Sequence, residues 1–288
     1  MKTINDLIDI LSLEEIDKNT YTGISKTIGS PNVFGGQVLA QALHAAYKTI
    51  PEDRIVHSLH SYFLLPGDLT IPITYKVTEM RNGGSFSTRR VTAMQKEKTI
   101  FILAASFHKR EDGYEHQEEI RQQIKQPEEL LSWSDMLEQF GDFLPNKMKD
   151  FLSIERPVEF KPVEIQNPME KKDLPAVEDV WFKLKGESSH LSLPLKQQIL
   201  TYISDYNILS AALKPNASKA HFGNTQMASL DHSMWFSRDF DFDDWMLFSA
   251  VSPSTSGARG LAMGNIFTRD GKLVATVAQE GLMRPKTK

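Results

Sequence analysis

The residue that most strongly indicates chemistry in this sequence is Asp205. It lies within a predicted helix, from about Ser192 to about Leu213, that is apolar on nearly every side, and a helix of that kind is buried in a folded protein. Aspartate is a poor residue for a helix interior, and a buried carboxylate needs partners. Two interpretations stay open at this point: an acid–base group in a closed site, or a structural aspartate bonded to local backbone or to a tyrosine.

A second group of reactive residue types lies in the stretch Ser229-Leu230-Asp231-His232-Ser233. Serine, aspartate and histidine together resemble the parts of a hydrolase triad, but no Gly-x-Ser-x-Gly nucleophile elbow surrounds Ser229. Side chains alternate along a strand, so Ser229 and Asp231 are expected on one face and His232 on the other. Asp231 and His232 should therefore not pair, and residues that fix a strand end are favoured over a triad.

The pair Gly35-Gly36 opens another predicted helix. Glycines at a helix start allow close approach to free backbone N–H groups. Such a helix start stabilises a developing oxyanion or a phosphate. Packing of the helix against a sheet explains the two glycines at least as well.

The remaining polar candidates carry weaker signals. Gln279 follows the apolar residues of the last predicted strand, where a polar residue usually marks the strand's end. The sequence has neither metal-ligand spacing nor a Walker-type phosphate loop, and its basic residues do not cluster with aromatic ones. Some arginines on predicted strands are candidates to bind phosphate, although such faces are usually only solvated: Arg81, Arg89, Arg90, Arg259 and Arg284.

The composition is that of a globular protein. The chain has 288 residues, 40% hydrophobic and 24% charged, with a net charge of −4, which suits one large domain or two ordinary ones. The absence of cysteine excludes disulfides and a cysteine nucleophile. The sequence shows no secretory signal, no apolar run of membrane length and no Ser-Lys-Leu terminus. We therefore expect a cytoplasmic protein that neither inserts into membranes nor binds nucleic acid.

Two stretches of the sequence follow the same strand plan about 172 residues apart. His60-Ser61-Tyr62-Phe63 opens the first copy and His232-Ser233-Met234-Trp235-Phe236 opens the second, and strand-like segments follow both at similar spacing. This pattern predicts one small α+β unit that has been duplicated and fused. The seam between two such units is a common place for a ligand site.

The first copy is predicted to be one helix followed by a strand meander, which is the hotdog layout. Asn32 is positioned to cap a helix over 34–47, whose small residues would let it lie deep in a concave sheet. The N-terminal unit is expected over residues 1–112, and a charged, broken-helical connector over 113–155. Strands are expected at 21–27, 56–64, 71–81, 86–96 and 98–109.

The second copy is expected over residues 156–288, with the helix that contains Asp205 as its central helix. Asp270-Gly271 predicts a hairpin turn between the last two strands. Strands are expected at 158–165, 180–185, 227–237, 245–251, 258–268 and 273–283.

The longest motifs are VFGGQVLAQA at 33–42, VHSLHSYFL at 56–64, PITYKV at 72–77, SFSTRRV at 85–91, SLDHSMWF at 229–236 and QEGLMR at 279–284. In this order they resemble the type II acyl-CoA thioesterases, the TesB-like double-hotdog enzymes. The likeness covers about residues 5–285. It implies an α+β fold of two fused hotdog units, each a long helix wrapped by an antiparallel sheet.

The resemblance also implies the reaction and its residues. The family hydrolyses acyl-CoA thioesters to a free carboxylic acid and CoA with a water nucleophile, without metal or cofactor. Its catalytic Asp, Ser or Thr, and Gln fall on Asp205, Ser229 and Gln279. A homodimer or homotetramer is expected. Substrate-binding residues are expected among Gly35, Gly36, His57, Arg89 and Arg90.

Two departures from the family pattern affect regions expected to contact CoA or the acyl chain. Gly84 stands where the family usually has an arginine, and Ser237 and Asp239 flank Arg238 where histidine and proline are common. Two other functions stay open: a non-hydrolytic acyl-CoA binder, and a hotdog hydratase, which would use a histidine with a carboxylate. The histidines available for the latter are His57, His60 and His232.

Overall fold

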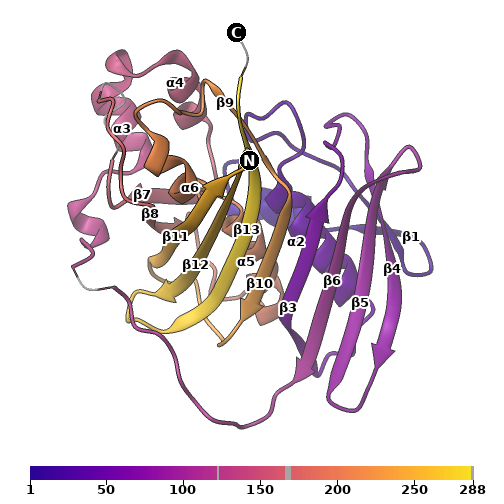
Figure 1. Ribbon diagram of the computed structural model, residues 1–288. Helices are drawn as coiled ribbons and strands as arrows, with labels where there is room; N and C mark the ends of the chain where they lie inside the picture. Colours follow the sequence, from indigo (N-terminus) through magenta and orange to yellow (C-terminus); the bar gives the residue numbers. More distant parts are fainter. Residues whose placement is uncertain (122, 166–169, 287–288) are drawn as a thin grey trace.

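The computed structural model describes residues 1–121, 123–165 and 170–286, and its main feature is one long antiparallel sheet (Figure 1). Within these residues the sheet has thirteen strands, in the order β1-β2-β4-β5-β6-β3-β10-β13-β12-β11-β8-β7, with β9 also paired to β13. Strands up to β3 in this order come from the first half of the chain, and the rest from the second. The protein has the double-hotdog α+β fold that the sequence predicts.

In the first unit, helix α2 (Gly35–Tyr47) lies on the inner face of five strands. Small residues of α2 such as Ala40, Ala42 and Ala46 are fully buried, and they let the helix backbone lie close to the sheet. The strands are, in spatial order, β2 (Thr20–Gly23), β4 (Ile73–Asn82), β5 (Phe86–Gln95), β6 (Lys98–Lys109) and β3 (Arg54–Phe63).

The second unit repeats this plan around helix α5 (Leu193–Ser204). The predicted hairpin turn between the last two strands is confirmed, because Gly271 adopts a φ of +93°, which favours glycine. The strands are, in spatial order, β10 (Asp231–Phe236), β13 (Leu273–Pro285), β12 (Arg259–Thr268), β11 (Met246–Ser256), β8 (Val177–Leu184) and β7 (Val158–Pro162).

The two units join through strands β3 and β10, which pair antiparallel at the centre of the sheet. His60 pairs with Ser233, and Ser61 pairs with His232. These pairs involve the two stretches that the sequence identifies as equivalent, so β3 and β10 face each other across an approximate two-fold axis. The seam predicted from the repeat is therefore a continuous strand pairing.

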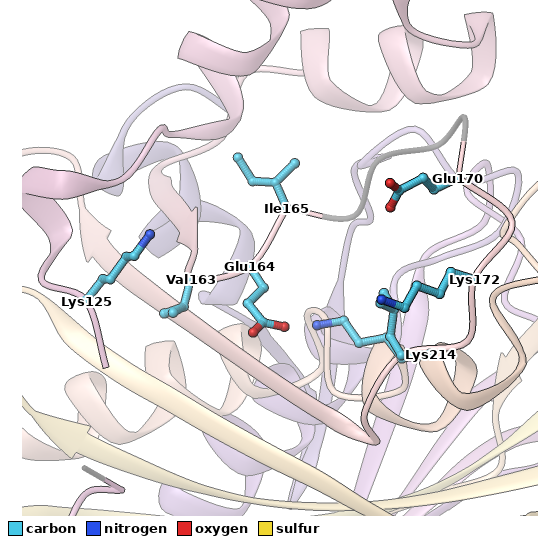
Figure 2. A pocket seen from close by; sticks show the side chains of 8 residues that line it. Lys125, Val163, Glu164, Ile165, Glu170, Lys172 and Lys214 are labelled. Atoms are coloured by element: carbon cyan, nitrogen blue, oxygen red, sulfur yellow. The ribbon is translucent and has the colours of Figure 1, made fainter. Parts of the chain in front are cut away.

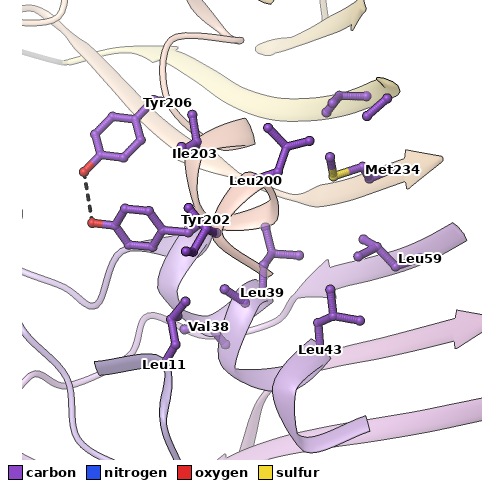
Figure 3. Close-up of a cluster of buried hydrophobic side chains, with 14 of the residues drawn as sticks. Leu11, Val38, Leu39, Leu43, Leu59, Leu200, Tyr202, Ile203, Tyr206 and Met234 are labelled. Carbon is purple, nitrogen blue, oxygen red and sulfur yellow. Dashed lines mark hydrogen bonds between the residues drawn. The ribbon is translucent and has the colours of Figure 1, made fainter. Parts of the chain in front are cut away.

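The hydrophobic core fills the space between the two central helices and the sheet (Figure 3). Leu39 and Leu43 of α2 and Leu200 of α5 are fully buried, and they face Leu59 of β3 and Met234 of β10. The helices run antiparallel, since the end of α2 contacts the start of α5 through Tyr47 and Gln197. The N-terminus of α2 is thereby brought to the C-terminus of α5.

Shorter elements surround these two units. No helix in the described part of the chain is long and apolar enough to cross a membrane. Helices α3 and α4 lie in the segment predicted as a broken helix. These elements are α1 (Ile4–Leu11), β1 (Glu14–Asp17), η1 (Pro127–Glu129), α3 (Trp133–Phe140), η2 (Gly141–Phe143), α4 (Asn146–Ser153), α6 (Ser210–Leu213), η3 (Lys214–Asn216) and β9 (Thr225–Ser229).

The central helix of the second unit differs from its prediction, because it ends at Ser204 instead of continuing to Leu213. Asp205 is the C-cap residue of α5, and Asn207 has a φ of +64°, in the left-handed region. Asparagine tolerates this conformation better than most residues. Asp205 is therefore not in a helix interior, and its side chain leaves the helix at the point where the chain turns.

The strand expected over 227–237 is also interrupted. β9 ends at Ser229 and β10 begins at Asp231. Along β13, Gly281 pairs with Ser229 whereas Ala278 pairs with Ser233, so one extra residue is inserted between these pairs. A bulge of this kind shifts the alternation of side chains between the two faces.

Candidate active site

Asp205, Ser229 and Gln279 meet in one place although they come from three separate elements. The Ser229 hydroxyl donates to Asp205 Oδ1 at 3.2 Å, and Gln279 Nε2 donates to the same oxygen at 3.0 Å. Gln279 Nε2 also donates to Ser229 Oγ at 2.8 Å. We call these three residues the Asp205 cluster. Gln279 is inside β13, which continues to Pro285. It lies within the strand expected over 273–283 and does not mark the end of that strand.

The first unit contributes to this cluster through the start of helix α2. The Gly36 N–H donates to Asp205 Oδ2 at 2.9 Å. The prediction that Asn32 caps this helix is wrong, because Phe34 is the N-cap residue and makes no side-chain cap. Asp205, about 170 residues away in the sequence, instead accepts one of the helix's first N–H groups. The positive end of the helix dipole also favours a carboxylate there.

The glycine pair is needed because the backbone and the carboxylate approach each other closely. A Cβ on Gly35 would lie 2.7 Å from Asp205 Oδ2, and a Cβ on Gly36 would lie 2.4 Å from the Tyr202 carbonyl oxygen. Both distances are shorter than a carbon side chain tolerates. The structure therefore places both predicted glycines beside the Asp205 cluster.

Burial raises the pKa of Asp205 to about 6, although hydrogen bonds from Gln279, Ser229 and Gly36 oppose the shift. The desolvation of the charged carboxylate is the largest cause. A carboxyl group with a pKa in this range is ionised at neutral pH and still basic enough to take a proton from water. The environment of Asp205 therefore fits an acid–base group.

His232 belongs to the site, although strand alternation puts it on the opposite face of the sheet from Ser229. Because of the bulge after Ser229, its ring points inward, where it is fully buried between Gln279 and Ser204. The expectation that Ser229 and His232 face opposite sides of the sheet is therefore wrong. The expectation that Asp231 and His232 do not pair is confirmed, since Asp231 Oδ1 accepts from the Glu280 N–H. The sequence did contain one signal for this position: alternation along the strand puts His232 on the same face as Met234, an apolar residue that is buried.

Arg89 does not fit its expected role in phosphate binding. Its side chain is 1% exposed, and its five N–H donors are used inside the first unit. They reach two atoms of Thr49, the carbonyl oxygens of Arg81 and Thr88, and Asn82 Oδ1. The arginine instead fixes the turn after β4 to the end of helix α2. The phosphate-binding assignment of Arg89 is wrong for this reason.

The other two substrate-binding candidates lie on the outer face of the sheet. Arg90 is exposed, and His57 packs against Phe86 and contacts Ser106 Oγ at 2.8 Å. Neither is brought to the Asp205 cluster, which lies on the inner side. His60 contacts Ser233. A hydratase would need a histidine hydrogen-bonded to the carboxylate, and within the described residues Asp205 has no such bond to a histidine.

Aromatic side chains form the apolar surroundings of the site. Phe34 packs against Tyr202 and Tyr206, with ring centroids 5.2 and 4.6 Å apart. The Phe63 ring lies next to Gly35. Two surface hollows of about 350 and 410 Å³ lie elsewhere. The first, shown in Figure 2, is lined mainly by lysines and glutamates such as Lys172, Lys214 and Glu164, and contains no residue of the Asp205 cluster.

Comparisons with known proteins agree with this site and fold. A family model described as acyl-CoA thioesterase N-terminal domain matches residues 24–108, and one described as acyl-CoA thioesterase matches residues 147–282. Acyl-CoA thioesterase 2 of Haemophilus influenzae is 42% identical over 98% of this chain and 98% of its own length. The chain belongs to the acyl-CoA thioesterase family.

Other relatives of this acyl-CoA thioesterase extend over the same length. Human acyl-coenzyme A thioesterase 8 is 38% identical, over 96% of this chain and 88% of its own. The crystal structure of the acyl-CoA thioesterase II TesB2 from Mycobacterium marinum superposes with a TM-score of 0.78 at 34% identity. It covers 97% of this chain and 98% of that one. Both halves of the chain, with the seam between them, therefore belong to the family's common architecture.

Proposed function

We propose that this acyl-CoA thioesterase cleaves its substrate with a water molecule that Asp205 activates and that Ser229 and Gln279 help to hold. The chain is a thioester hydrolase: an acyl-CoA and water become a free carboxylic acid and CoA. The observation that supports the assignment of residues is the Asp205 cluster itself, in which a carboxylate, a hydroxyl and an amide from three elements share hydrogen bonds.

The hydrogen bonds of the cluster leave a defined place for the water. A carboxylate accepts up to about four hydrogen bonds, and Asp205 accepts three, from Gly36, Ser229 and Gln279. Ser229 Oγ donates one and accepts one, so one of its lone pairs also stays open. A water that donates to both open positions keeps a lone pair for the thioester carbon. Gln279 uses its two N–H groups to hold the two acceptors in place.

Proton transfer and orientation then supply the catalytic effect. Asp205 takes a proton as the water attacks the thioester carbon, and the thiolate of CoA leaves. The Gly36 N–H donates to Asp205, so it is not available to the thioester oxygen. Of the two glycines expected to stabilise an oxyanion, only Gly35 stays a candidate. Its N–H finds no acceptor among the described residues, and we propose that it stabilises the negative charge on that oxygen.

Release of free thiol from acyl-CoAs of graded chain length tests the reaction. A chromogenic thiol reagent reports CoA directly, and the protein gives no background because it has no cysteine. Thiol release with a defined chain-length profile is the expected result. Binding of acyl-CoA without any thiol release would instead favour the non-hydrolytic acyl-CoA binder.

Substitutions of Ser229 should separate its hydroxyl from its shape. Ser229→Thr keeps the hydroxyl and is expected to retain most of kcat. Ser229→Ala removes a hydrogen bond to a charged group and should lower kcat by about ten- to a hundredfold. Steady-state thiol release from one acyl-CoA measures both variants. Inactivity of Ser229→Thr together with activity of Ser229→Ala would contradict the proposed role of the hydroxyl.

The pKa of Asp205 predicts how activity depends on pH. The general base must be ionised, so kcat/KM should be constant above the pKa of about 6 and fall as the pH drops through it. Well below that pKa the loss should approach about tenfold per pH unit. A pH profile of kcat/KM measures this limb. The residual activity of Asp205→Asn is the matched control, because it should lack the limb.

We further propose that the chain forms a homodimer or homotetramer, because hotdog sheets usually pair. Light scattering during gel filtration measures the molar mass in solution. The mass of a monomer at the protein concentrations used in activity assays would reject the proposal. The cytoplasmic location and the unit boundaries expected at residues 1–112, 113–155 and 156–288 stay predictions.

A further inference from the structure

His232 is held on both ring nitrogens in a fully buried position. Its Nδ1 lies 2.5 Å from Gln279 Oε1, and its Nε2 lies 2.9 Å from Ser204 Oγ. Its exposed fraction is 0%, and that of Ser204 is also 0%. The Ser61 hydroxyl of the first unit fixes the His232 carbonyl oxygen at 2.8 Å. A ring with this burial and these contacts has one orientation.

The state of the ring follows from the partners it meets. Burial lowers the pKa of His232 to about 4, so the ring is neutral at neutral pH and carries a single N–H. Gln279 Oε1 is only an acceptor, so Nδ1 must carry that hydrogen. Nε2 is then an acceptor, and the Ser204 hydroxyl donates to it. The alternative acceptor of Ser204 is the carbonyl oxygen of Thr201, at 2.9 Å.

We propose that His232 is a positioning residue for the hydrolysis, whose Nδ1–H fixes the orientation of the Gln279 amide so that both amide N–H groups face Asp205 and Ser229. This inference rests on the proposed function, because it acts through the Asp205 cluster. With Nδ1 protonated, the donors run from Ser204 to His232, from His232 to Gln279, and from Gln279 to Asp205 and Ser229. The Ser204 hydroxyl hydrogen then points to His232 and not to the Thr201 carbonyl oxygen. Both ring nitrogens of His232 are used by Gln279 and Ser204, so in this proposal His232 acts on the reaction only through Gln279.

The amide needs this support because the reversed orientation harms the cluster. If the amide turned over, Oε1 would face the Asp205 carboxylate at about the present 3.0 Å separation, acceptor against acceptor. The turned amide would also require the opposite ring tautomer, with Nε2 donating to Ser204 and Nδ1 accepting. A neutral imidazole holds one tautomer at a time, so the tautomer of His232 and the orientation of Gln279 are set together.

The tautomer of His232 is measurable without any activity. Long-range ¹H–¹⁵N correlation spectra of ¹⁵N-labelled protein distinguish a protonated Nδ1 from a protonated Nε2, and the signal that disappears in His232→Asn identifies the residue. A protonated Nδ1 with an unprotonated Nε2 at neutral pH is the expected result. A protonated Nε2 in the wild-type protein would overturn the inference.

Two substitutions of His232 test its effect on the reaction. In asparagine the amide nitrogen is bonded to Cγ, as Nδ1 is, whereas in glutamine it is one bond further out, as Nε2 is. His232→Asn is therefore expected to keep kcat within about threefold, since it retains a donor toward Gln279. His232→Gln loses that donor and should lower kcat by about ten- to a hundredfold with KM nearly unchanged.

A double substitution separates positioning from a general loss of structure. In a Gln279→Ala background, His232→Gln should cause no further loss of kcat, because the amide it positions is already absent. Equal, additive losses in both backgrounds would overturn the inference, as would wild-type kcat in His232→Gln. If His232→Gln does not fold, as thermal unfolding would reveal, the tautomer measurement alone decides.

The outcomes also distinguish this inference from the proposed function. If Asp205→Asn is inactive but His232→Gln is active, the assignment of Asp205 as the general base stands and the positioning role of His232 is rejected. If Asp205→Asn stays active, the assignment of Asp205 as the general base is rejected, whichever tautomer of His232 is measured.

Discussion

Replacement of Asp205 by asparagine is expected to lower kcat by about 10²–10⁴-fold, the contribution typical of a general base. Asparagine has nearly the same shape, and its Oδ1 can still accept from Ser229 and Gln279, as Asp205 Oδ1 does. It cannot take a proton from water at neutral pH. Its amide nitrogen replaces Oδ2, which accepts from the Gly36 N–H, so the variant should fold with somewhat lower stability and bind acyl-CoA while turnover is lost. Thiol release and the KM for one acyl-CoA measure this result.

The controls for Asp205→Asn are its fold and its binding. Thermal unfolding should show a cooperative transition, and a non-hydrolysable thioether analogue of acyl-CoA should bind about as tightly as to the wild type. Turnover equal to that of the wild type would refute the assignment of Asp205 as the base. Loss of both folding and binding would show instead that Asp205 acts mainly as the cap of helix α2.

Replacement of Gly36 by alanine is expected to reduce both stability and turnover. Alanine in place of glycine favours a helix by about 1 kcal/mol, but here the new Cβ would lie 2.4 Å from the Tyr202 carbonyl oxygen. That atom is backbone, so the helices α2 and α5 must separate, and overpacking of this kind costs about 1–3 kcal/mol. The Gly36 N–H would then move away from Asp205. A displacement of about 1 Å in a catalytic group can lower kcat by about 10²-fold.

Urea unfolding and steady-state kinetics measure these two effects of Gly36→Ala. Gly113→Ala is the matched control, because a Cβ on Gly113 meets no atom within 4 Å. It should change the free energy of unfolding by less than about 0.5 kcal/mol and leave kcat unchanged. Unaltered stability and kcat in Gly36→Ala would mean that the close approach of the two helices is not required.

Asp205 could be predicted from the sequence because a charge within an apolar segment is costly unless it has partners. The end of the helix could not be placed in the same way. Tyr206 and Ile208 continue the apolar pattern beyond Asp205 and are themselves buried, so periodicity does not change where the helix stops. The turn depends on packing between two halves of the chain, which local patterns do not contain.

The meeting of Ser229 and His232 on one side of the sheet could not be predicted from the sequence, for a related reason. Strand alternation holds only where the pairing register is constant, and the extra residue after Ser229 is visible only in the pairing with β13. Arg89 is different, because its burial could have been predicted. It alternates in phase with Val91 and Ala93, which are fully buried, so the pattern already indicated an inward side chain. Its expected role in substrate binding rests on its charge and on its place beside Arg90, and does not take this alternation into account.

The antiparallel arrangement of the two central helices means that equivalent positions in the two units can differ in function. Each helix start lies beside the end of the other helix, so the chain has two such junctions. At one, Asp205 ends α5 and holds the start of α2. At the other, Lys48 ends α2, and the start of α5 after Ser192 receives no side-chain cap. One junction thus holds a carboxylate, whereas its counterpart is the Tyr47–Gln197 contact. With Asp205 as the proposed base, the two hotdog units would share one reaction centre.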